Sequence, residues 1–124
     1  MDSQFTIREQ IIEVVNKLFV YTDNQEWTKL QEEVFATHVE LDMASMGAKR
    51  SELVSSREVC YRSEKVFEGL DAIHHQAGNY LVKIDGDKAE VTCNEMRSYG
   101  FHKATMQLIK EDQKWQILQY DWQP

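Results

Sequence analysis

The sequence predicts an α+β fold in which helices dominate the first part of the chain and antiparallel strands the last. Near the N-terminus apolar residues recur at the three-to-four-residue spacing of helices, and from residue 80 onward they alternate with polar residues, as in half-buried strands. An Asp85-Gly86 pair between two alternating segments is typical of a tight β-hairpin. The chain has 124 residues, enough for one core, so we expect a single domain over residues 1–124.

The first helix is expected to begin after Thr6. Apolar residues recur at helical spacing over residues 7–19, with charged and amide residues between them. Thr6 followed by Glu9 is the capping-box pattern, in which each side chain bonds a free backbone N–H of the first turn. The helix should therefore run from Thr6 to about Tyr21.

A second helix should follow a tight corner at residues 22–24. Asp23 and Glu26 repeat the start pattern just before Trp27, which opens another apolar helical face. In one interpretation the carboxylate of Asp23 caps this helix, the more common role of an aspartate at such a position. In the other, Asp23 is a catalytic partner that orients an imidazole.

The middle of the chain should hold a strand, a loop and a third helix. Apolar and polar residues alternate over residues 38–43, which predicts a half-buried strand. Residues 46–54 have no clear period and are interpreted as a loop. Ser55 and Glu58 form another capping box, so a third helix should begin there and end before Gly69.

The rest of the chain is expected to form antiparallel strands. Residues 80–84 and 89–93 flank the Asp85-Gly86 turn, and residues 104–108 and 115–122 continue the alternation. Trp115 and Ile117 should lie on one face of the last strand, with Leu118, Tyr120 and Trp122 on the other. Helices and strands thus separate along the chain, as in α+β proteins.

Composition excludes several classes of function. There are 14 basic and 21 acidic residues, a formal net charge of −7, and scattered cations do not favour binding to nucleic acid or to an anionic membrane surface. No apolar run is long enough to span a bilayer. Cys60 and Cys93 form no CxxC pair and no secretory leader is visible, so we expect a cytoplasmic protein with free thiols.

Several motifs for catalysis and for ligand binding are also missing from the sequence. It contains no glycine-rich phosphate loop, no serine-hydrolase elbow and no calcium-binding loop. The four histidines lack the spacing of metal ligands. We therefore expect neither a metal nor a cofactor, and the expected partner is a small-molecule ligand.

Polar residues continue the apolar face of the strand after the hairpin. Alternation puts Glu95, Arg97 and Tyr99 on the same face of the strand as the apolar residues at 89, 91 and 93. This face therefore changes from apolar to polar along the strand. This pattern fits a sheet that is open, as a pocket, at one end, where Tyr99 would bond a substrate carbonyl or enolate. It also fits a strand that leaves the core, with Glu95 and Arg97 paired in water. The residues expected to line the core or the pocket wall are Tyr21, Trp27 and Met43.

Two adjacent histidines precede the hairpin. His74 and His75 should point to opposite faces of a strand, and His74 has the parity of Tyr80 and Val82. His74 is therefore the predicted inward residue. It is either a general base, since an imidazole exchanges protons near neutral pH, or a buried neutral histidine bonded to a backbone carbonyl.

The order of these elements and four sequence segments resemble one known family. The segments are YTDNQEW after the first helix, HVELDM in the first strand, AIHHQAGNYLVKIDGDKAEV across the hairpin and KWQILQYDW at the end. From Thr6 to Trp122 the chain resembles the SnoaL-like branch of the nuclear-transport-factor-2-like superfamily, which includes scytalone dehydratase and bile-acid dehydratases. The resemblance implies a strongly curved, cone-shaped mixed or antiparallel sheet, closed by three helices around an apolar pocket.

The resemblance also implies an activity. Asp23 matches the family's acidic residue before a tryptophan, and His74 matches the histidine that forms a dyad with it. Family members remove a proton next to a carbonyl and then lose water, isomerise or close a ring, without a cofactor. We expect a lyase or isomerase acting on a small apolar carbonyl or ring substrate, with Tyr99 and Arg97 stabilising the anion. The alternative is a non-catalytic domain that binds a small molecule or dimerises.

The chain departs from scytalone dehydratase at two positions. That enzyme has a tyrosine directly before the matching aspartate and another in the first strand, where this chain has Thr22 and Met43. Tyr21 lies one position away, about 100° around a helix. It does not simply replace the first missing tyrosine.

A homodimer is expected through the outer face of the sheet. Trp115, Tyr120 and Trp122 are too large to fill the interior of one small cone together. The resemblance implies the same arrangement, since many family members pair through this face.

Overall fold

The computed structural model describes residues 4–42, 51–70, 73–97 and 100–121. Its helices are α1 (Ile7–Asp23), α2 (Trp27–Glu33) and α3 (Ser56–Phe67). Its strands are β1 (Phe35–Asp42), β2 (Glu52–Ser55), β3 (Gln76–Asp85), β4 (Lys88–Arg97), β5 (Gly100–Glu111) and β6 (Lys114–Asp121). The α+β class predicted from the sequence is confirmed.

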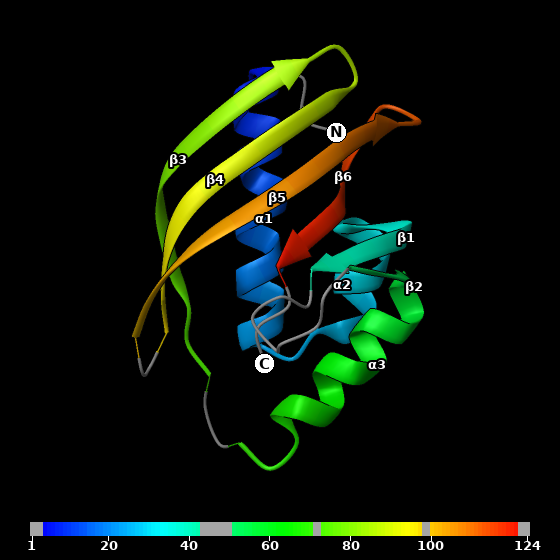
Figure 1. Cartoon of the computed structure of the whole chain (residues 1–124), viewed down its shortest axis with the longest axis vertical. Coiled ribbons are helices and arrows are strands. Elements are labelled where there is room, and N and C mark those ends of the chain that lie inside the picture. The colour runs from blue at the N-terminus through cyan, green and yellow to red at the C-terminus, as the bar shows by residue number, and fades with distance from the viewer. Residues whose placement is uncertain (1–3, 43–50, 71–72, 98–99, 122–124) are drawn as a thin grey trace.

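The strands form one mixed sheet in the order β2-β1-β6-β5-β4-β3. β1 and β6 are parallel, and the other neighbouring strands are antiparallel. Figure 1 shows β3, β4 and β5 curving side by side over α1, while α2 and α3 lie beside the short strands β1 and β2. The sheet is thus strongly curved, with β2 and β3 as its open edges.

α1 begins at the predicted capping box. The Thr6 hydroxyl accepts a hydrogen bond from the Glu9 backbone N–H at 3.1 Å, and the Glu9 carboxylate accepts one from the Thr6 N–H at 3.0 Å. The hydrogen bonds from Thr6 lower the pKa of Glu9. One face of the helix is buried, at Ile11, Val15 and Leu18, because apolar residues three and four apart share a side of an α-helix.

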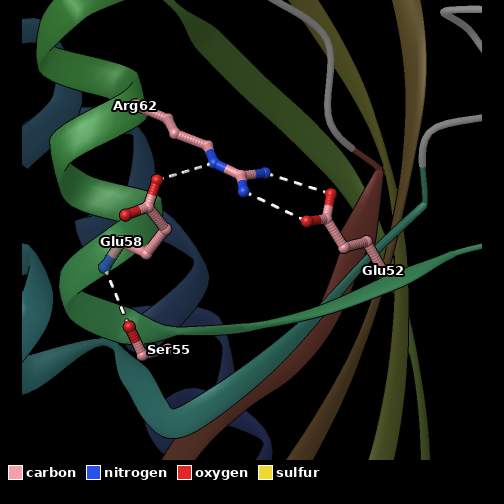
Figure 2. Close-up of polar contacts among 4 residues, drawn as sticks. All are labelled: Glu52, Ser55, Glu58 and Arg62. Carbon is pink, nitrogen blue, oxygen red and sulfur yellow. Dashed lines mark hydrogen bonds and ion pairs between the residues drawn. The ribbon is translucent and has the colours of Figure 1, made fainter.

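β2 corrects the prediction of a loop over residues 46–54. Four residues are too short to show a period, so the strand is set by its pairing with β1 rather than by its own pattern. Figure 2 shows how it is tied to α3: the Arg62 guanidinium donates to both carboxylate oxygens of Glu52, at 3.0 and 3.1 Å, and to Glu58 at 2.9 Å. The predicted N-cap Ser55 is confirmed, since its hydroxyl accepts from the Glu58 N–H at 3.1 Å.

Arg62 also changes the protonation of Glu52. Its guanidinium donates two hydrogen bonds and stabilises the carboxylate, so the pKa of Glu52 lies below its ordinary value. The pKa of Arg62 is raised for the same reason. This bidentate contact makes β2 and α3 one unit at the edge of the sheet.

The hairpin between β3 and β4 is confirmed, with its turn one residue later than predicted. Asp85 and Lys88 are paired across the ladder, so the two loop residues are Gly86 and Asp87. Gly86 takes a φ of 61°, and Asp87 does not enter the positive-φ region. This is the pattern of a type II′ turn, which needs positive φ at its first central residue only.

A β-bulge interrupts β3. Gly78 is paired with Asn94, but the next pair along the strand joins Leu81 to Thr92, so β3 contains one extra residue. Asn79, inside the bulge, has a φ of 56°, a left-handed conformation that asparagine tolerates better than most residues. An extra residue shifts the alternation of side chains by one position. Odd-numbered residues before the bulge therefore lie on the same face as even-numbered residues after it.

A second bulge interrupts β6 with the same effect. Tyr120 is paired with Met106, whereas Ile117 is paired with Leu108, so β6 also contains one extra residue. Tyr120 therefore lies on the inner face with Ile117, and its ring stacks on Phe35 at 5.6 Å. The prediction that Tyr120 lies on the opposite face from Ile117 is wrong.

The core lies between the three helices and the concave face of the sheet. Its largest fully buried side chains are Phe35, Ile11, Leu30, Leu41, Met106, Leu108 and Ile117. Trp115 is only 4% exposed, so it fills the interior, and it does not supply the outer apolar surface from which the dimer was predicted. Trp122 lies outside the described residues.

Both cysteines belong to this core as free thiols. Burial raises the pKa of Cys60 to about 12. Burial, with a smaller effect of the nearby Glu95 charge, raises the pKa of Cys93 to about 11. Both thiols are therefore protonated and act as small apolar groups.

Candidate active site

Asp23, the last residue of α1, binds His75 twice. Its Oδ2 accepts a hydrogen bond from the His75 backbone N–H at 2.8 Å, and its Oδ1 contacts the ring Nδ1. The side chains are 13% and 9% exposed respectively. This pair joins the end of α1 to the segment that enters β3.

Asp23 does not cap α2. The N-cap of that helix is Glu26, which makes no side-chain hydrogen bond to the helix backbone. The carboxylate of Asp23 is used by His75 instead. The capping interpretation of Asp23 is therefore wrong.

His74, the predicted inward histidine, points to solvent. Its side chain is 72% exposed, and its Nδ1 lies 3.9 Å from Asp23 Oδ2, beyond hydrogen-bond distance. The prediction assumed that side chains alternate without interruption from Val82 back to His74, which would put both on one face. The bulge at Asn79 exchanges the faces, so His75 takes the buried position.

Phe19 forms a wall for the imidazole of His75. The two rings stack at a centroid distance of 5.7 Å and an interplanar angle of 30°. Phe19 lies four residues before Asp23, so both project from the same side of α1. One helix thus provides the carboxylate that binds Nδ1 and the aromatic ring that restricts the imidazole plane.

Glu95 of β4 faces the other nitrogen of His75. Its Oε1 lies 3.6 Å from His75 Nε2, and the residue is only 8% exposed. Val91 and Cys93, which precede it on the same face, are also buried. Glu95 therefore lies inside the fold, not in water as the alternative interpretation of this strand required.

A hollow of about 520 Å³ adjoins Glu95. Its described lining residues are Gln76, Ala77, Gly78, Asn79, Asn94, Glu95, Met96 and His102. Glu95 is paired directly with His102 on β5, and residues opposite each other in a ladder project from the same face. Two titratable side chains from neighbouring strands therefore line one hollow, beside the Asp23–His75 pair.

Two of the residues predicted to line the core or the pocket wall, Tyr21 and Trp27, pack against the core. The Tyr21 hydroxyl donates to Glu33 at 3.0 Å, and Lys17 donates to the same carboxylate oxygen at 3.2 Å. Trp27 stacks on Phe67 of α3, with a centroid distance of 6.0 Å and nearly parallel rings. Both Tyr21 and Trp27 are packed against the core, and neither is bonded to the Asp23–His75 pair.

Three other predicted site residues are not described. Met43 and Tyr99 lie outside the described residues, and of Arg97 only the backbone, at the end of β4, is described. The structure thus brings together Asp23 and Glu95 from the predicted set, adds His75 in place of His74, and adds Phe19 and His102. The Gly78-Asn79 pair within a strand pattern was the available signal for His75, because such residues favour bulges.

Neither a metal centre nor a membrane span is found in the described parts of the chain. No group of three or more His, Cys, Asp or Glu side chains there is arranged to hold a metal ion. The helices described are too short or too polar to cross a bilayer.

Comparison with known proteins identifies both a family and a fold. The model of the family described as SnoaL-like domain matches residues 3–122. No curated protein matches the chain. The neighbours among solved structures share too little sequence to show more than the fold.

Three of these structures illustrate the similarity. The Kfla4162 protein of Kribbella flavida is 18% identical, with a TM-score of 0.75 over 92% of this chain and 87% of its own. A candidate dehydratase of the NTF2-like family from Streptomyces avermitilis is 12% identical, with a TM-score of 0.70 over 92% and 93%. A candidate scytalone dehydratase from Novosphingobium aromaticivorans is 10% identical, with a TM-score of 0.68 over 92% and 80%.

Proposed function

Because this chain belongs to the SnoaL-like domain family, we propose that it is a cofactor-independent lyase or isomerase that acts on a small apolar carbonyl or ring compound. The observation that carries this proposal is the buried Asp23–His75 pair. A carboxylate on Nδ1 orients the imidazole and stabilises its protonated form. The same carboxylate–imidazole arrangement supports proton transfer in many unrelated enzymes.

The proposed reaction begins with removal of a proton next to a carbonyl group. The electron pair moves onto the carbonyl oxygen as an enolate, which either expels a hydroxyl group as water or is reprotonated at another carbon. The proton is held in the cluster of Asp23, His75 and Glu95, where an imidazolium would lie within 4 Å of both carboxylates. Tyr99 and Arg97 are proposed, from their places in the sequence, to stabilise the enolate.

Two structural neighbours carry names that agree with this reaction class. One is named as a candidate dehydratase and another as a candidate scytalone dehydratase. Dehydration of a β-hydroxy carbonyl compound needs no more than a base, an acid and donors for the enolate. The cluster of Asp23, His75 and Glu95 offers groups that can serve as the base and the acid.

The proposal is tested by hydrogen–deuterium exchange at carbon. A panel of cyclic ketones and β-hydroxy ketones is incubated with the protein in D₂O, and deuteration, water loss and double-bond migration are followed by NMR. His75→Ala should strongly slow the exchange that the unmodified protein catalyses, whereas His74→Ala should leave it unchanged, because His74 is exposed. A His75→Ala protein that remains fully active would contradict the proposal.

A non-catalytic binding domain is the second candidate, and one contact favours it. Asp23 binds the His75 backbone N–H as well as the ring, so the pair also ties α1 to β3 as a purely structural contact would. In that case His75→Ala should lower the melting temperature and leave the affinity of any ligand found in the panel unchanged. Loss of exchange with the melting temperature preserved would exclude this candidate.

We also propose that the protein is a cytoplasmic homodimer formed through the outer face of the sheet. The support on that face is exposed apolar surface at Leu81, which is 70% exposed, and at Met96. Sedimentation velocity at micromolar concentration should show a dimer, and Leu81→Lys should shift it to monomer. Val20→Lys, at an exposed apolar site on α1, is the control and should leave the dimer intact.

A further inference from the structure

Given the proposed acid–base function, on which this rests, we infer that Glu95 is the side chain that takes the proton from the ligand, and that Asp23 and His75 act behind it as positioning residues. The starting observation is which groups reach the hollow. Glu95 and His102 line it, whereas His75 and Asp23 do not belong to its described lining. A ligand in the hollow therefore meets Glu95 first.

The orientation of His75 leads to the same assignment. Its Nδ1 is occupied by Asp23, and one face of its ring is covered by Phe19. Its Nε2 is directed at Glu95, 3.6 Å away. Each ring nitrogen thus faces a carboxylate, and of these two carboxylates it is Glu95 that lines the hollow.

Glu95 is also placed to pass a proton on to His75. The Nε2 atom of His75 lies 3.6 Å from Glu95 Oε1, on the side of the carboxylate that is away from the ligand. Asp23 holds the imidazole in this position through Nδ1 and the backbone N–H.

His102 supplies a second proton-transfer group to the same ligand. It lies directly opposite Glu95 in the ladder between β4 and β5 and lines the same hollow. Cβ atoms of residues paired in this way are about 4.5–5.5 Å apart. A base and an acid so close on one face suit a ligand whose acidic C–H and leaving oxygen are on neighbouring carbons, so the geometry favours syn elimination from a β-hydroxy carbonyl compound.

The base can be tested without the natural substrate by using 5-nitrobenzisoxazole. A general base removes the proton on C3, the electron pair of that C–H bond forms the C≡N bond, and the N–O bond breaks to release the coloured 2-cyano-4-nitrophenolate. The compound needs no cofactor, and the hollow, at about 520 Å³, is within the range of small-molecule pockets. Its cleavage reports on the base alone.

The expected result separates Glu95 from its neighbours. Glu95→Gln, which keeps the shape of the side chain, should lower kcat by roughly 10²-fold or more, whereas Glu95→Asp should retain part of the activity. Glu90→Gln is the matched control: Glu90 is on the same strand, on the opposite face, where it accepts a hydrogen bond from Gln107. It should leave the rate unchanged, and circular dichroism should show that all variants are folded.

His75→Gln identifies the positioning role. With the carboxylate still in place, the variant should retain measurable turnover above the Glu95→Gln level, with a lower kcat and a nearly unchanged KM. If Glu95→Gln keeps the rate of the unmodified protein while His75→Gln loses it, His75 is the base itself: the inference is overturned and the proposed function stands. If the unmodified protein is no faster than Glu95→Gln, the inference is overturned as well, while deuterium exchange in the ketone panel still decides the proposed function.

Discussion

Asn79 determines which face of the sheet His75 occupies. Asn79 lies in the left-handed conformation inside the bulge of β3, and the extra residue there places His75 on the same inner face as Val82. Without it, the unbroken alternation of a strand would direct His74 inward instead. The candidate site thus depends on a backbone feature that lies four residues from its histidine.

Substitution of Asn79 should therefore affect stability according to backbone conformation. Asn79→Gly, which adopts positive φ readily, should remain close to the unmodified protein, whereas Asn79→Val should be destabilised by about 1–3 kcal/mol. Urea unfolding followed by tryptophan fluorescence measures the difference. Equal stability of the two variants would contradict the role assigned to the positive φ of Asn79.

Asp23→Asn should change the tautomer of His75. An amide can still accept a bond from the His75 N–H, but its NH₂ group would donate to ring Nδ1, so the ring proton should move to Nε2. Long-range ¹H–¹⁵N spectra of the imidazole, with the exposed His74 as internal reference, measure this directly. An unchanged spectrum for His75 would show that the contact between Oδ1 and Nδ1 does not set its protonation.

Arg62→Gln should remove a pH-dependent part of the stability. Because Arg62 lowers the pKa of Glu52 in the folded protein, the stabilisation is present above the ordinary value of 4.5 and is lost as the pH falls through the lowered folded value. Urea unfolding should show a stability difference between the two proteins at pH 7 that disappears in this acidic window. Arg57→Gln, also on α3 and exposed, should show no such change.

The cysteines should be unreactive in the folded protein. With the pKa of Cys60 raised to about 12 and that of Cys93 to about 11, neither forms appreciable thiolate at pH 8. Ellman's reagent should modify both only after addition of denaturant. Rapid modification of the folded protein at either position would contradict the burial described for that thiol.

Local patterns in the sequence were sufficient for most of the elements. The capping boxes at Thr6 and Ser55 identified the starts of α1 and α3, because a cap requires only residues three positions apart. The turn between β3 and β4 was found for the same reason, within one residue. β2 was missed because a four-residue strand on a sheet edge is formed by its partner β1.

The sequence could predict which face of the sheet a side chain occupies only where no bulge interrupts the strand. Alternation correctly placed Glu95 on the inner face of β4, a strand whose register is continuous from Lys88 to Arg97 against β5. In β3 and β6 it assigned His74 and Tyr120 to the wrong faces, because each strand contains one extra residue.

The sequence by itself determined the α+β class, the starts of the long helices and the presence of an acidic residue and a histidine pair. Only the tertiary structure decided that His75 meets Asp23, because that contact joins residues 52 positions apart and depends on the register of β3. Side-chain parity is a local property of an extended backbone, whereas a bulge is a property of two paired strands. The pairing of β3 with β4 therefore decides which histidine is buried.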